Sequence, residues 1–169
     1  MPDTLKEKFR IYKNKFFIVC AVLLALNFFV FSEIGRAGAN ENLKIYFLNV
    51  GQGDSELVIL EGGAKLLIDG GLPNGKVVGN LETILGSRDR YIDLVLMTHP
   101  QLDHFGGLID VMNRYKIGAF LWSGKEADIA AFTDLQKVKE KNGIRDIVLA
   151  KGDILTYKAN RIDILSPTP

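Results

Sequence analysis

The sequence is short of two residue types that often carry stability or chemistry: it has one cysteine and two histidines among 169 residues. The single cysteine, Cys20, lies in an apolar run near the N-terminus, so residues 40–169 can form no internal disulfide. That part must be stabilised by a hydrophobic core or by a bound metal ion. An excess of positive charge is also absent there, with 15 Lys and Arg against 17 Asp and Glu. Nucleic acid is a possible partner that the charge does not support, because binding phosphates needs clustered basic side chains.

A long uncharged run begins after five basic residues near the N-terminus and covers residues 16–31. It is longer than most signal-peptide cores but shorter than the roughly 20 residues of a comfortable membrane-spanning helix. We therefore expect residues 1–39 to be either a signal peptide cleaved after Ala39 or a single membrane anchor that contacts the membrane through residues 16–31. A buried amphipathic helix is the weaker alternative, because the run is apolar on all sides. The basic end predicts an extracytoplasmic body, secreted or anchored in the cytoplasmic membrane with the C-terminal part outside.

Residues 40–169 read as one globular domain in which hairpin strands come first and strands and helices then alternate. Strands are expected at 43–50, 55–60, 65–69, 92–97, 117–122, 146–150, 154–157 and 161–165, and helices at 77–85, 105–115 and 126–141. The order predicts an α+β fold in which helices cover a sheet. The loops at the carboxyl ends of the strands are then the natural place for chemistry.

Both histidines fall in the run HPQLDH, residues 99–104, directly after a continuous apolar strand. Imidazole and carboxylate are ligands that zinc and similar metals prefer. The buried strand fixes His99, Asp103 and His104 stand at a helix start, and the glycine pair 106–107 permits close approach of another segment or a ligand. These features favour a metal site. In the alternative interpretation, Asp103 caps the helix, His104 is an exposed first-turn residue, and His99 bonds to backbone.

Several separate segments together resemble the metallo-β-lactamase superfamily and, within it, the hydrolase-like domain of the ComEC-type competence proteins. The segments are NVGQGDS at 49–55, LIDGG at 67–71, LMTHPQLDHFGG at 96–107 and IDILSP at 162–167. The resemblance covers 43–169, about the first half of the family's domain. It implies a metallo-β-lactamase-like αββα sandwich, first half only, so that residues 40–169 are the N-terminal part of such a domain.

The resemblance also implies roles for single residues. His99 would bind a first metal ion, and Asp103 and His104 a second, with Asp103 also counted as catalytic. Asp69 would support the metal loop through hydrogen bonds. Independently of the resemblance, Asp54 follows the turn at residues 51–53 and is a candidate to face the same cleft, with capping of the turn as the commoner role of such a residue. The implied cofactor is zinc, one or two ions, and a metal-bound hydroxide would attack an ester, amide or phosphodiester.

The chain departs from the family pattern at the metal loop and beyond it. Gln101 stands where the superfamily usually has His, and an amide oxygen is a poor zinc ligand. No His or Cys follows His104. The chain thus supplies two or three ligands split between two metal positions, so we expect weak zinc occupancy and a metallo-hydrolase that is incomplete or inactive as given. Half a sandwich also predicts either a fragment of a longer protein or a half that needs a complementing half-domain or partner chain. The alternative function is a non-catalytic binding or assembly module of a DNA-uptake or cell-envelope complex.

Two further features have ordinary structural interpretations. Trp122 ends a predicted strand and is expected in the core or at its rim. Lys137, Lys139, Lys141 and Arg145 predict a solvated helix face, with contact to DNA as the alternative.

Overall fold

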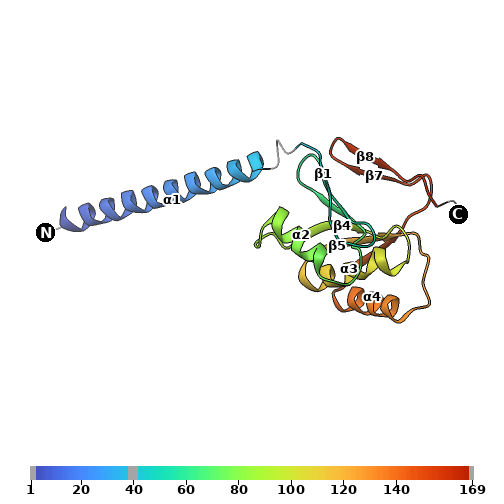
Figure 1. Ribbon diagram of the computed structural model, residues 1–169. Coiled ribbons are helices and arrows are strands. Elements are labelled where there is room, and N and C mark those ends of the chain that lie inside the picture. The colour runs from blue at the N-terminus through green and yellow to red at the C-terminus, as the bar shows by residue number, and fades with distance from the viewer. Residues whose placement is uncertain (1–2, 38–41, 168–169) are drawn as a thin grey trace. The chain divides into compact units, whose positions relative to one another are not determined.

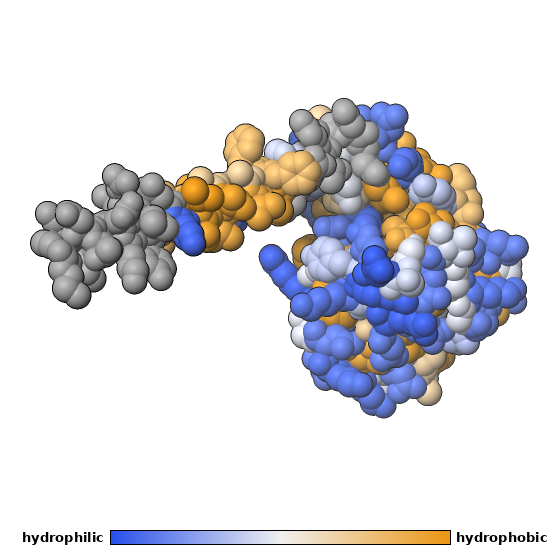
Figure 2. Space-filling view, turned by 90° about the vertical axis from the view of Figure 1, so that its left-hand side faces the viewer, coloured by the Kyte–Doolittle hydropathy of each residue, from blue (hydrophilic) through white to orange (hydrophobic). Residues whose placement is uncertain are grey.

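A computed structural model of the protein describes residues 3–37 and 42–167, and the side chains of residues 15–32 and 42–167. The chain divides into two compact units, Met1–Asn40 and Glu41–Pro169. The first contains one helix, α1 (Asp3–Ala37). Its stretch Lys15–Ser32 is long and apolar enough to cross a membrane, as a signal sequence would also be. Figure 2 shows the described side chains of this helix mostly in the hydrophobic colour.

The second unit is built on a six-stranded mixed sheet in the order β1-β2-β3-β4-β5-β6 (Figure 1). The first three strands form an antiparallel meander, and β3 to β6 lie parallel to one another. The strands are β1 (Lys44–Phe47), β2 (Glu56–Ile59), β3 (Lys65–Ile68), β4 (Tyr91–Leu96), β5 (Lys116–Trp122) and β6 (Arg145–Val148). The helices are α2 (Lys76–Leu85), α3 (Leu102–Arg114) and α4 (Ala130–Lys141). A hairpin of β7 (Ile154–Tyr157) and β8 (Asn160–Asp163) follows.

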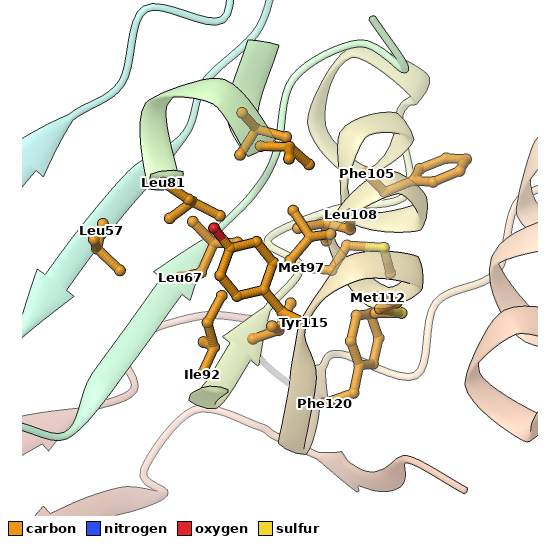
Figure 3. Close-up of a cluster of buried hydrophobic side chains, with 14 of the residues drawn as sticks. Leu57, Leu67, Leu81, Ile92, Met97, Phe105, Leu108, Met112, Tyr115 and Phe120 are labelled. Carbon is orange, nitrogen blue, oxygen red and sulfur yellow. The ribbon is translucent and has the colours of Figure 1, made fainter. Parts of the chain in front are cut away.

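The main core lies between the sheet and its three helices (Figures 1 and 3). Leu67 and Phe120 from the sheet are buried against Leu81 of α2 and Leu108 of α3. The apolar residues at helical spacing in α3 and at its C-cap are all buried there: Leu108, Val111, Met112 and Tyr115. This packing fixes the start of α3 against the carboxyl ends of β3 and β4.

The opposite face of the sheet carries a smaller apolar cluster, covered in part by the β7–β8 hairpin. Leu66 and Leu121 are buried in it. The β1–β2 register places Ile45 opposite Val58, which packs on this cluster, so the apolar side chains of β1 point to the same side. They are poorly covered: Leu43, Ile45 and Phe47 are 51%, 53% and 82% exposed. This face is therefore apolar and only partly buried.

Two predicted helix starts were wrong. Helix α3 begins at Leu102, three residues early, and its N-cap position is Gln101, so Asp103 lies within the first turn and is not the cap. Helix α4 begins at Ala130, four residues late, because Ile129 is extended, with φ −139° and ψ 148°. Ile129, at the N-cap position, is 43% exposed.

Lys139 was also predicted wrongly as part of a solvated face. Its side chain is 3% exposed, and its Nζ lies 2.8 Å from Asp146 Oδ2. The same Nζ lies 4.5 Å from the ring centroid of Phe120 and 4.7 Å from that of Trp122. The ion pair and the two aromatic faces offset the cost of removing this charge from water. Trp122 itself is buried, as the core interpretation predicted.

Candidate metal centre

The two histidines meet one buried carboxylate where β3 and β4 end and α3 begins. Asp69 follows β3 and is 2% exposed, His99 lies three residues after β4, and His104 lies in the first turn of α3. One possible ligand atom from each of the three lies within 4.8 Å of the others. The two imidazole rings are 3.9 Å apart between centroids. The fold thus gathers three metal-binding groups from positions up to 35 residues apart.

Close backbone packing around glycines creates this arrangement. The Gly70 N–H donates to the His104 carbonyl at 2.7 Å, which joins the end of β3 to the start of α3. A Cβ on Gly107 would overlap the carbonyl oxygen of Gly70, and a Cβ on Gly53 would overlap that of Asp103. Gly53 also has φ +85°, which other residues rarely adopt. Only glycine therefore lets the three motif segments approach each other this closely.

Asp69 and Thr98 hold both histidines in position. Asp69 Oδ1 accepts the Thr98 backbone N–H at 2.8 Å, and Asp69 Oδ2 accepts the Thr98 hydroxyl at 2.5 Å. The same Oδ2 lies 2.8 Å from His104 Nδ1. Because its proton goes to Asp69, the Thr98 oxygen is left to accept from His99 Nδ1, 2.9 Å away. Both Nδ1 atoms are thereby occupied, which assigns Nε2 of each ring to a cation, although Gln101 would have to move aside from Nε2 of His99.

These contacts suit Asp69 to orienting the histidines, since direct ligation by it would compete with bonds that both of its oxygens already make. Gln101 occupies the other side of His99, with Oε1 3.1 Å from Nε2. The residue that departs from the family pattern therefore sits next to the nitrogen that would face a metal ion.

Asp103 and Asp54 lie near the cluster but outside the group of three. Asp103 Oδ2 accepts a hydrogen bond from Gln52 Nε2 at 3.4 Å. The Asp54 side chain is exposed, while its backbone carbonyl accepts the Gly71 N–H at 3.1 Å. Ligation or catalysis by Asp103 and a supporting role for Asp54 stay predictions.

Glu56, which the sequence reasoning missed, belongs to the electrostatics of this site. It lies half-buried on β2 opposite Ile68, one residue before Asp69. Burial raises the pKa of the Glu56 carboxyl, the negative charges of Asp54 and Asp69 raise it further, and His104 opposes them. The feature of the sequence that could have indicated Glu56 is its position as the single acidic residue at the start of an apolar strand. Its charge adds to the attraction that the site would exert on a cation.

The candidate ligands are of the chemical type that zinc prefers, but there are fewer of them than a catalytic zinc site uses. Two imidazole Nε2 atoms supported by hydrogen bonds on Nδ1 are what such an ion requires. A catalytic zinc site uses three protein ligands, and the third here must come from Asp103, from Asp69 after rearrangement, or from outside the described residues.

Comparison with known proteins identifies the family. A sequence profile described as the metallo-β-lactamase superfamily matches residues 48–149, more than half of the chain and all three segments of the site. The chain therefore belongs to the metallo-β-lactamase superfamily. The metal dependence of that family agrees with the Asp69, His99 and His104 cluster. No curated protein sequence matches the chain.

Solved structures agree on the fold. The subclass B3 metallo-β-lactamase MEM-A1 from a soil metagenome library is similar, with 17% identity over 70% of this chain and 48% of its own, and a TM-score of 0.50. BJP-1, a subclass B3 enzyme of Bradyrhizobium japonicum, has 20% identity over 70% of this chain and 47% of its own, also with a TM-score of 0.50. The chain spans about half the length of these structures. The predicted fold class is confirmed, and the match is partial, covering part of the neighbours' fold.

Proposed function

We propose that this protein is an exported or membrane-anchored hydrolase of the ComEC-type branch, acting on an ester or phosphodiester bond with a weakly held zinc ion. The observation that carries the proposal is the network in which Asp69 and Thr98 occupy the Nδ1 atoms of His99 and His104. Histidines with no functional role would not require a buried carboxylate that holds both rings in position. This network supports the assignment of both histidines as metal ligands.

Each residue would have one part in the reaction. His99 and His104 would hold the ion through Nε2, and Asp69 and Thr98 would keep both rings in the required orientation. A bound divalent ion supplies an activated water and polarises the scissile group. Asp103, now bonded to Gln52, is the carboxylate that we expect to bind the ion or accept the proton of the attacking water.

Hydrolysis of bis(p-nitrophenyl) phosphate and of p-nitrophenyl acetate in the presence of zinc tests the proposal. His99→Ala should abolish the zinc-dependent rate on whichever substrate the parent cleaves. The matched control is Lys116→Gln. Lys116 is exposed at the amino end of β5, whereas the cluster lies at the carboxyl ends of the strands. An unchanged rate in His99→Ala would show that the metal mechanism is wrong.

We further propose that a complementing half-domain or partner chain covers the partly buried face of the sheet. The exposed apolar side chains of Leu43, Ile45 and Phe47 support this, as does the match to only half of the solved neighbours. The membrane-spanning composition of Lys15–Ser32 supports delivery to, or anchoring at, the extracytoplasmic side of the membrane.

A non-catalytic binding or assembly module in the cell envelope is the second candidate, and the incomplete ligand set favours it. Zinc-stimulated hydrolysis by the parent protein distinguishes the hydrolase from the binding module. A binding module would show no such hydrolysis, and His99→Ala would not change its attachment to membranes.

A further inference from the structure

A pocket of about 810 Å³ lies beside the histidine cluster, at the carboxyl ends of β4, β5 and β6. His99 forms part of its wall, and Trp122, Val148 and Ile164 are among its apolar lining residues. Open sheets with parallel strands bind ligands at this edge, and pockets of this size accommodate a small organic molecule. The pocket and the candidate metal centre are therefore neighbouring parts of one surface.

Lys125 is the one residue in the lining of this pocket that carries a permanent charge. The carboxylate of Asp69 lies behind the lining residue Thr98, but it is buried and hydrogen-bonded to Thr98 and His104. Lys125 is exposed just after β5, where Gly124 turns the chain with φ +77°. An ammonium group at an otherwise apolar pocket favours a ligand that combines an apolar body with a negative charge.

We propose that this pocket binds the apolar group of a small anionic substrate, an aryl or short-chain acyl group, with Lys125 paired to the negative charge. Only the orientation of the scissile bond toward His99 rests on the proposed function. Binding in the pocket requires neither a metal ion nor hydrolysis. A carboxylate-bearing ester and an aryl phosphodiester both meet the description, and neutral esters do not.

Calorimetric titration of the full chain in detergent, with chelator present, tests the pocket directly. The probes are phenylacetate and phenyl phosphate, with neutral phenylacetamide and inorganic phosphate for comparison. We expect both aromatic anions to bind more tightly than either comparison probe, and the tighter of the two tells whether carboxylate or phosphate is preferred.

Three variants assign the binding to the pocket. Lys125→Gln should weaken phenylacetate at least about fivefold, the loss of roughly 1 kcal/mol of ion pairing, and leave phenylacetamide unchanged. Ala150→Trp should weaken all aromatic probes by filling the pocket, since Ala150 lines it. Lys116→Gln, which lies outside the lining, should change nothing.

The proposal is overturned if inorganic phosphate binds as tightly as phenyl phosphate, or if Lys125→Gln and Lys116→Gln behave alike. Its failure is distinguishable from failure of the proposed function. A chain that binds no aromatic anion but loses zinc-dependent hydrolysis in His99→Ala retains the function without the pocket. A chain that binds phenylacetate but hydrolyses nothing retains the pocket alone.

Discussion

At the scale of single residues, the hydroxyl of Thr98 connects the buried carboxylate of Asp69 to His99. It donates to Asp69 and accepts from His99, so the orientation of His99 depends on a side chain that is itself no ligand. His104 is instead fixed by Asp69 without an intermediary. Asp69 therefore holds the ring of His104 by a direct hydrogen bond and the ring of His99 through the hydroxyl of Thr98.

Removing the Thr98 hydroxyl should therefore weaken cation binding. Thr98→Val keeps the shape of the side chain but leaves His99 Nδ1 and Asp69 Oδ2 without this partner, and we expect zinc affinity to fall by about 10- to 100-fold. Thr98→Ser keeps the hydroxyl and should stay close to the parent. Competition with a zinc-binding dye measures both.

Equal zinc affinity in Thr98→Val and the parent would contradict the positioning role. A loss in both Thr98→Val and Thr98→Ser would assign the effect to the methyl group and its packing. Circular dichroism of each variant without metal confirms that the fold is retained.

At the scale of elements, the start of α3 is held against the end of β3 by backbone contact that leaves no room for side chains. Gly107 of α3 approaches the carbonyl of Gly70, and the Gly107 N–H donates to Gly71 O at 2.9 Å. Gly79 of α2 is different, because a Cβ added there would meet nothing within 4 Å. Gly107 is therefore required by the close packing of α3, whereas Gly79 can be replaced by a larger residue without a steric clash.

Gly107→Ala should destabilise the domain by about 1–3 kcal/mol or more, because the new methyl group would force the helix away from β3. Gly79→Ala should stabilise it by about 0.5–1 kcal/mol, since alanine is the better helix former and the space is open. Urea unfolding followed by circular dichroism measures both. Similar changes in the two variants would show that α3 does not depend on this contact.

Glu82 links three elements through charge. Its Oε1 lies 2.9 Å from Nη2 of Arg90, before β4, and 2.9 Å from Nη2 of Arg114 in α3. The hydrogen bond from Arg90 holds the pKa of the Glu82 carboxyl below its usual 4.5, with burial opposing and the charges of both arginines assisting. A carboxyl with a lowered pKa stabilises the fold above its unfolded pKa, and this stabilisation is lost as the pH falls through the lowered value.

Glu82→Gln should consequently lower the melting temperature slightly at pH 7, and the difference from the parent should shrink as the pH falls below about 4.5. The effect is small because the carboxylate is a third exposed. Melting curves from pH 3 to pH 7 measure it, with Glu140→Gln on the exposed face of α4 as the control. A difference that stays constant with pH would exclude the ion pairs as its cause.

At the scale of the whole molecule, periodicity in the sequence predicted the α+β order, the three helices of the second unit and the six strands of the main sheet. The start of α4 and the burial of Lys139 were not predictable in the same way. Lys139 is buried because Phe120, Trp122 and Asp146 come from two other strands, and local charge patterning contains no trace of them.

The same division applies to the candidate metal centre. Histidines five positions apart at a strand–helix junction could be recognised from the sequence, and so could Asp69 through the family resemblance. The bridging role of Thr98 and the nearness of Glu56 depend on strand pairing between distant segments. A single sequence gives little direct information on which residues of distant strands lie opposite one another.

Among the described residues, two imidazoles and one buried carboxylate form a candidate metal site, which is fewer groups than a closed zinc site with its supporting residues needs. The most direct test is elemental analysis of the purified full chain after dialysis, beside the His99→Ala/His104→Ala double variant. We predict less than about one zinc ion per parent chain and none in the double variant, because a closed site needs three or more protein ligands. Two retained ions per chain, or equal zinc in parent and variant, would contradict this prediction and the metal centre on which it depends.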